Sequence, residues 1–188
     1  MKAIACIIFV SFLFISIPQI FAQDQQEAWR DYMTPGSVHQ MMAESAGEWT
    51  SEITMWMNPT QSPLKSDVSC SNEMIMGGRY LKSSQKGNMM GMPFEGMMLL
   101  GYDNAKKIFT AVWYDNFGTG TTVSTGTYND QDSTLTLNGA MVDPATGNDI
   151  KYRETMKFID KDHQILTMYV NQDNQEFKNM EQVLTRKK

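Results

Sequence analysis

The chain has 188 residues, with 21 acidic against 16 basic side chains and a formal net charge of −5 at pH 7. This length suits one domain with a sizeable core. A mildly acidic chain without a visible basic patch is not expected to bind nucleic acid, because that function requires clustered Lys and Arg.

Residues 1–22 have the features of an export signal. Lys2 gives a positive start, a largely apolar run follows from Ala3 to Ile17, and Ala22 is a small residue suited to cleavage. The run is shorter than the roughly 20 apolar residues that a membrane-spanning helix needs. Cys6 lies inside the run, so the cleavage point has no cysteine for lipid attachment. We therefore expect export to the periplasm or secretion, without a membrane anchor.

Removal of this signal would leave Cys70 as the one cysteine, which excludes an internal disulfide. Cys70 is in phase with Val68 and Met74 on an expected strand, so we predict that it is buried. Nothing nearby in the sequence would activate its thiol.

A short helical region is predicted after the signal. Residues 25–33 and 37–46 have helical patterns, and Pro35 and Gly36 separate them. Ser37 is the expected N-cap of the second helix, with a capping box completed by Gln40. We expect residues 23–47 to pack as a helical segment on a barrel formed by residues 48–188.

From Glu48 onward the hydrophobic pattern changes to period 2. Ten strands are expected, at 48–57, 66–76, 79–86, 92–101, 106–115, 120–129, 133–141, 149–159, 163–171 and 176–186. Turn residues separate them, and Gly77-Gly78 allows the positive φ of a tight reversal. Because no long helix interrupts the strands, we predict a mainly β fold. It is a single antiparallel up-and-down β-barrel of about ten strands with a short N-terminal helical region.

Two of the expected strands are apolar on both faces, at 94–102 and 109–113. Neither face of such a strand lies in bulk water. A closed barrel satisfies this pattern if its outer face is partly covered or if its inner face lines an apolar cavity.

Short sequence pieces resemble the bacterial domain-of-unknown-function family 1579, from Trp29 to the carboxyl end. They are Tyr32–Gly36 with His39, Gly47–Trp49, Gly77–Tyr80, Gly91–Gly96, Leu100–Asp103, Trp113–Asn116, Gly118–Gly120 and Asp143–Gly147. Their order and spacing together carry the resemblance. It implies a calycin-like, lipocalin-type β-barrel, similar to fatty-acid-binding and nitrobindin barrels. The family has no settled biochemical activity, so the resemblance leaves function open.

No catalytic constellation is visible in the sequence. G-x-S-x-G, HExxH and zinc-spaced Cys/His clusters are all missing from it. His39 and His163 are expected to be surface or capping residues. Similarity to nitrobindin barrels offers His163 as a haem ligand, but the polar, turn-like residues 160–162 before it argue against a buried haem face. We therefore expect no enzymatic activity and no cofactor.

The chain contains 17 methionines. Met89, Met90 and Met92 resemble the thioether motifs that bind Cu(I), since soft sulfur prefers a soft metal. The other methionines follow strand alternation, and methionine fills irregular apolar space. We therefore favour a core or cavity lining, with copper binding as a weaker alternative.

Aromatic, apolar and charged residues on the expected strands supply the candidates for a ligand pocket. They are Trp49, Arg79, Tyr80, Phe94, Glu95, Met98, Tyr102, Trp113 and Arg153. A buried charge needs a partner, so an Arg79–Glu95 ion pair is one hypothesis. Two solvated charges at the barrel rim are the alternative. The basic tail, Arg186 to Lys188, is expected to be solvated.

The leading hypothesis is an exported barrel that binds a small hydrophobic or amphipathic ligand in its interior. The alternative is a filled barrel that acts as a structural or protein-interaction module without a ligand. An enzyme is a third, weaker reading, and the oligomeric state is left open. Uptake of a hydrophobic probe that quenches Trp49 or Trp113 separates the first hypothesis from the second.

Overall fold

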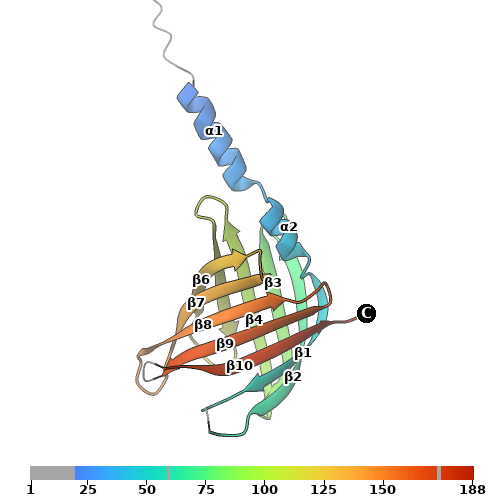
Figure 1. Ribbon diagram of the computed structural model, residues 1–188, viewed down its shortest axis with the longest axis vertical. Coiled ribbons are helices and arrows are strands. Elements are labelled where there is room, and N and C mark those ends of the chain that lie inside the picture. The colour runs from blue at the N-terminus through green and yellow to red at the C-terminus, as the bar shows by residue number, and fades with distance from the viewer. Residues whose placement is uncertain (1–19, 59, 173–174) are drawn as a thin grey trace, which may run out of the picture.

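A computed structural model describes residues 20–58, 60–172 and 175–188. Within these ranges, ten antiparallel strands form one closed barrel (Figure 1). The strands are β1 Gly47–Met55, β2 Leu64–Ile75, β3 Tyr80–Met89, β4 Met92–Asp103, β5 Ile108–Asp115, β6 Thr122–Asn129, β7 Thr134–Val142, β8 Asp149–Phe158, β9 His163–Gln172 and β10 Gln175–Arg186. Each strand pairs with its sequence neighbours, and β1 also pairs with β10. The predicted up-and-down barrel is therefore confirmed. Residues 1–19 of the expected signal lie outside the described residues.

Alternation along each strand decides which side chains enter the barrel. In β7, the inward-facing Leu135 and Leu137 are 1% and 2% exposed, whereas the next residue, Asn138, points outward and is exposed. The predicted burial of Cys70 is likewise confirmed, since this side chain is 1% exposed on the inner face of β2. Its Sγ lies 3.3 Å from the Ser83 hydroxyl oxygen on β3. Burial raises the pKa of the Cys70 thiol.

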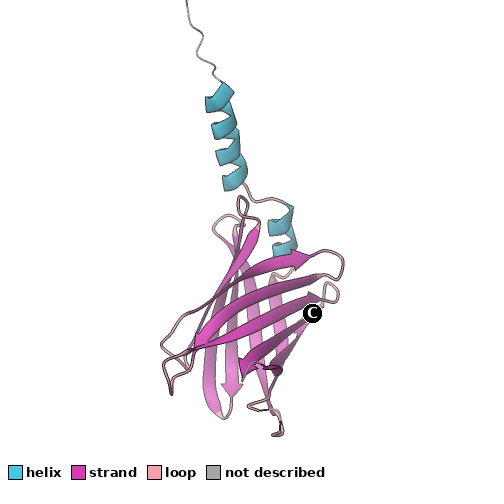
Figure 2. Ribbon diagram, turned by 60° about the vertical axis from the view of Figure 1, so that its left-hand side comes forward, coloured by secondary structure: helices cyan, strands magenta, loops and turns pink. Residues whose placement is uncertain are grey.

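Helix α2, Ser37–Ala43, lies over one end of the barrel (Figures 1 and 2). Met42 is 2% exposed and packs in the same cluster as Leu81, Leu100, Phe109, Leu135 and Leu137. The prediction of Ser37 as the N-cap is wrong, because Gly36 occupies that position. The Gly36 N–H donates instead to Nδ1 of His39, at 3.1 Å. We call this end of the barrel the closed end and the opposite end the mouth.

Helix α1, Ile20–Met33, extends away from the barrel in both views (Figures 1 and 2). Its side chains from Gln23 to Met33 are exposed. The helix is attached at its carboxyl end, where the Arg79 guanidinium donates to the Met33 carbonyl and the Asn104 amide donates to the Asp31 carbonyl. Residues 23–47 are predicted to pack on the barrel as one segment. In the structure α2 covers the barrel end, whereas α1 does not pack along it. No helix within the described ranges is long and apolar enough to cross a membrane.

The closed end carries the tight turns between β2 and β3, β4 and β5, β6 and β7, and β8 and β9. The first of them reverses at Gly77 and Gly78 with φ of +66° and +80°, as their sequence predicts. The mouth carries the connections that follow β1, β3, β5 and β7. These mouth loops include the exposed residues 116–121 and 144–149.

Candidate functional site

The barrel interior contains a cavity of about 680 Å³. Its walls are the inner faces of the strands, and it reaches the exposed loop residues 117–121 and Pro144 at the mouth. At the other end, α2 and the side chains packed beneath it close the barrel. The cavity is therefore open to solvent at one end, and its volume falls in the range of small-molecule pockets.

Methionine dominates the apolar wall of this cavity. Among the described residues that line it, seven are methionines: Met55, Met89, Met98, Met141, Met156, Met168 and Met180. Ile53, Phe94 and Trp113 add branched and aromatic surface nearer the mouth. Unbranched thioether side chains repack easily around differently shaped ligands. This wall can therefore adapt to an apolar molecule without a rigid complementary shape.

Buried amides and hydroxyls form a polar band nearer the closed end, on the same strands that carry several of these methionines. The Gln182 amide nitrogen donates to Ser51 Oγ at 2.6 Å and to Gln85 Oε1 at 3.0 Å. The Gln164 amide nitrogen donates to Ser45 Oγ at 2.9 Å. These polar groups are paired with one another, so the band costs little desolvation energy in the empty barrel.

Glu154 is different, because its carboxyl has no such partner. It lies on the inner face of β8, opposite Leu137 on β7 and Met168 on β9, and it lines the cavity. No hydrogen bond or ion pair joins its carboxyl to any of the residues that the structure describes. Burial raises the pKa of Glu154 to about 7. A carboxyl that is half ionised near neutral pH thus stands in a largely apolar chamber.

Tyr152 extends the polar character of this wall. It follows the same phase of β8 as Glu154 and is 7% exposed. Burial raises the pKa of the Tyr152 phenol, and a hydrogen bond with Ser124 opposes part of that rise. Tyr152 therefore stays neutral and can donate or accept a hydrogen bond beside Glu154.

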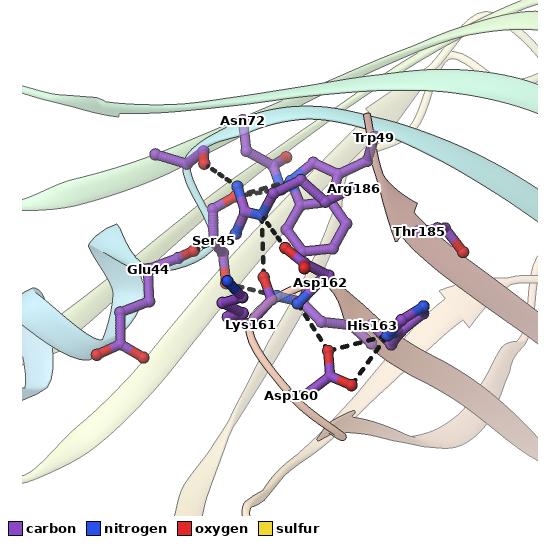
Figure 3. A network of polar contacts seen from close by, with 12 residues as sticks. Glu44, Ser45, Trp49, Asn72, Asp160, Lys161, Asp162, His163, Thr185 and Arg186 are labelled. Atoms are coloured by element: carbon purple, nitrogen blue, oxygen red, sulfur yellow. Dashed lines mark hydrogen bonds and ion pairs between the residues drawn. The ribbon is translucent and has the colours of Figure 1, made fainter. Parts of the chain in front are cut away.

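A network around Arg186 fastens the closed end (Figure 3). The Arg186 guanidinium donates to the carbonyls of Glu44 and Ala46 after α2, and to the carbonyl of Lys161 at 2.9 Å. Its carbon lies 4.2 Å from the centre of the Trp49 ring. The prediction of a wholly solvated basic tail is therefore wrong for Arg186. This side chain joins the end of α2 to β10 and to the β8–β9 turn.

Three of the nine predicted pocket residues lie on the cavity wall. They are Phe94, Met98 and Trp113. Phe94 and Trp113 stack, with ring centroids 6.4 Å apart and an angle of 21° between their planes. The Trp113 indole N–H donates to Asp115 at 2.6 Å, which fixes the ring at the mouth.

Two further candidates point inward but lie away from the cavity. Trp49 is fully buried beneath Arg186, and its indole N–H donates to the Ser45 carbonyl at 3.0 Å. Tyr102 packs under α2, with its ring centroid 4.8 Å from that of Phe109. Both residues therefore seal the closed end.

The other four candidates lie outside the barrel interior. Tyr80 and Arg79 are exposed at the closed end, and Arg153 forms an outer-face ion pair with Glu176, at 2.7 Å. The predicted Arg79–Glu95 pair is wrong, because Glu95 pairs with Lys86 at 2.9 Å on the outer face. Strand alternation explains this, since Glu95 follows the inward-facing Phe94.

The methionines proposed as copper ligands occupy two environments. Met89 is 6% exposed and lines the cavity, whereas Met90 and Met92 are 42% and 50% exposed at the β3–β4 turn. Among residues 20–58, 60–172 and 175–188, no group of three or more His, Cys, Asp and Glu is placed to hold a metal ion.

The two histidines lie outside the cavity. His39 lies on the buried face of α2 and is 5% exposed, and burial and the nearby Arg79 lower its pKa. Its Nδ1 caps the helix, so it acts as a neutral structural residue. His163 is exposed and bonds through Nδ1 to Asp160, at 2.9 Å.

Glu154 is the residue that the sequence reasoning missed. A usable signal was present, because Glu154 falls in the same phase as Tyr152, Met156 and Phe158 on β8. Charged residues alternate with this apolar phase on the same strand. An acidic residue within an inward phase is unusual enough to mark a site.

Both the sequence and the fold of this chain are similar to those of known proteins. A family model described as "Protein of unknown function (DUF1579)" matches residues 34–186, which confirms the predicted resemblance. The crystal structure of Rv2717c from M. tuberculosis is similar, with a TM-score of 0.61 and 17% identity over 82% of this chain and 100% of that one. The S-type phycobiliprotein lyase CPES from Guillardia theta is also similar, with a TM-score of 0.56 and 12% identity over 81% and 94% of the two chains. At these identities the likeness shows the barrel fold alone. A comparison of the sequence with curated proteins gives no match.

Proposed function

The chain belongs to the DUF1579 family, and we propose that it binds a small hydrophobic or amphipathic molecule inside its barrel. The observation that carries this proposal is the cavity of about 680 Å³, open at the mouth and walled mainly by apolar side chains. Small-molecule sites have this size and composition. A filled barrel, the alternative function class, would leave no such space.

The lining itself favours a ligand over empty packing. Protein interiors are normally close-packed, whereas this apolar wall faces solvent that enters through the mouth. Covering the wall with an apolar molecule removes that surface from water, which favours binding. The methionine wall supplies an adaptable apolar surface with a few polar side chains set into it, which is the usual pattern of a binding site.

Quenching of Trp113 by a terminally brominated long-chain alcohol tests this function. Bromine quenches tryptophan at contact, and Trp113 is a wall residue of the cavity. Trp113 is one of four tryptophans, so we expect a partial and saturable loss of emission. Fluorescence titration measures it.

Matched variants locate the quencher. The Trp113→Phe protein should lose the quenching, whereas Trp29→Phe should retain it, because Trp29 is 62% exposed on α1. The proposal fails if the alcohol does not quench, or if quenching is the same in both variants.

We also propose that residues 1–22 direct the chain out of the cytoplasm. The support is the sequence pattern of a positive start, an apolar run and a small residue at Ala22. Bacterial expression of the whole chain should yield exported protein whose first residue is Gln23. Amino-terminal sequencing of the extracytoplasmic fraction measures this. Recovery of the chain in the cytoplasm with Met1 to Ala22 attached would contradict the proposal.

A further inference from the structure

The unpaired carboxyl of Glu154 gives the cavity a chemical preference. Glu154 faces the cavity from the middle of β8, between Leu137 on β7 and Met168 on β9. The side chain is half-buried, with its carboxyl toward the cavity, and acidic groups that are withdrawn from bulk water in this way are normally paired with a cation or held by several hydrogen-bond donors. Here the described residues supply neither, so the group is ready to receive a partner from a ligand.

The charges around the cavity have one sign. Among the described residues that line it, Glu154 and Asp115 are charged, and none is Lys, Arg or His. Asp115 stands at the mouth, where it accepts hydrogen bonds from the Trp113 indole at 2.6 Å and from the Phe117 N–H at 2.9 Å. An anionic molecule would therefore meet like charge at both the entrance and the wall.

The paired amides leave Glu154 as the strongest unmet polar group. Gln182, Gln85 and Gln164 already bond to neighbouring side chains. A ligand gains little by competing for them, because each new bond would replace an existing one. A ligand that offers a positively charged donor to Glu154 gains an ion pair in a chamber of low polarity.

We propose that the ligand is a cationic amphiphile of the primary alkylamine class, whose ammonium group pairs with Glu154 while its apolar chain lies along the methionine wall. This inference rests on the proposed function, because it names the ligand class of the same cavity. Tyr152 and Ser124 stand on the neighbouring wall positions, and their hydroxyl oxygens can accept the remaining ammonium hydrogens.

Such an interaction depends on pH through Glu154. Among the described residues, the other titratable groups that line the same cavity are Tyr152 on the same strand and Asp115 on β5 at the mouth. Burial raises the pKa of Tyr152, so this phenol stays neutral near pH 7. The inner positions of β7 and β9 beside Glu154 carry no charge. With a pKa of about 7, the Glu154 carboxyl ionises between mildly acidic and mildly basic pH, and alkylamines stay protonated throughout.

Calorimetric titration of the whole protein with octylamine, octanol and octanoate tests the inference. At about pH 8.5 octylamine should bind at least about 10-fold more tightly than octanol, and octanoate should bind most weakly. On lowering the pH to about 5.5, the octylamine affinity should fall by up to about 30-fold, which is the change in the ionised fraction of a group with a pKa of about 7. The octanol affinity should change less than about 2-fold.

Variants connect the preference with one side chain. Glu154→Gln should reduce the octylamine affinity to that of octanol and remove its pH dependence. Glu95→Gln should change neither, because Glu95 is exposed on the outer face. If octylamine binds no better than octanol to the native protein, or if its advantage survives in Glu154→Gln, the inference is overturned. If none of the three molecules binds, the proposed function fails as well.

Discussion

Replacement of Glu154 by glutamine is expected to raise the free energy of unfolding by roughly 1 to 3 kcal/mol at pH 8.5 and by almost nothing near pH 4. The reason is burial, which raises the pKa of Glu154 from its ordinary value of 4.5 to about 7. Each pKa step of one corresponds to about 1.4 kcal/mol between the protonation states, which sets the upper end of this range, and solvent that enters the open cavity screens the carboxylate and lowers the effect. Glutamine keeps the shape of the side chain and removes the charge.

The direction follows from which state loses its proton first. Below pH 4.5 Glu154 is protonated in both the folded and the unfolded chain, so it does not lower the free energy of unfolding. As the pH rises from 4.5 to about 7, the unfolded chain ionises while the folded chain does not, so stability is lost. Above about pH 7 both forms are ionised, and the loss reaches its full value.

Other carboxyl groups act in the opposite direction. Hydrogen bonds lower the pKa of Asp103, Asp143 and Asp160, so these residues favour the folded chain as the pH rises. The total pH profile is therefore a sum of opposing effects. The difference between the native protein and Glu154→Gln isolates the one residue.

Urea denaturation at several values between about pH 4 and pH 8.5 measures that difference. Glu95→Gln is the matched control, because it removes an exposed carboxylate whose ion pair with Lys86 contributes at most about 1 kcal/mol. A Glu154→Gln difference that is equal at all pH values would contradict the assignment of a buried, uncompensated carboxyl. A destabilising result at pH 8.5 would contradict it more directly.

Glu154 lowers the stability of the folded chain when it is ionised, which suggests that the carboxyl serves ligand binding. Buried groups that destabilise the folded chain are retained where a ligand or a reaction needs them. In this barrel the compensation would come from a bound cation, which pairs with the carboxylate and reverses its pKa shift. Stability and ligand preference are thus two measurements of the same carboxyl.

The sequence predicts the barrel well because its main signals are local. Period-2 alternation and turn residues act over a few positions, so they identify the strands to within two or three residues of their observed ends. The N-cap was misplaced because a glycine and a histidine side chain replaced the usual capping pair. The local sequence favours Ser37 as the N-cap, but the N-cap is Gly36 and Ser37 is the first residue of the helix.

The site was harder to predict because it depends on distant contacts. The Arg79–Glu95 hypothesis rests on the need of a buried charge for a partner, although the phase of β4 alone places Glu95 on the outer face. The local sequence predicts a solvated tail at Arg186, because the carbonyl groups that its side chain binds lie more than 100 residues earlier in the chain. Glu154 was detectable from its phase. Its lack of a partner depends on what β7 and β9 place beside it, which only the closed barrel reveals.

The β6–β7 pair supports the cavity wall at a point where only glycine fits. Gly126 on β6 pairs with Leu137 on β7, and Leu137 in turn pairs with Glu154. A Cβ atom at position 126 would overlap the carbonyl oxygen of Thr136 and lie 2.8 Å from its carbonyl carbon and 2.9 Å from the Leu137 Cα. These are backbone atoms, so no rotation of a side chain relieves the contact.

Gly126→Ala is therefore expected to lower the free energy of unfolding by at least about 3 kcal/mol, because the two strands must move apart and break their pairing. Urea denaturation with circular dichroism measures the loss. Gly120→Ala is the matched control, since a Cβ atom there meets nothing within 4 Å, and it should change stability by less than about 0.5 kcal/mol. Equal stability of the two variants would show that β6 and β7 can shift to admit a side chain. Because Leu137 lies between Gly126 and Glu154, a loss in Gly126→Ala should also weaken octylamine binding in whatever folded protein remains.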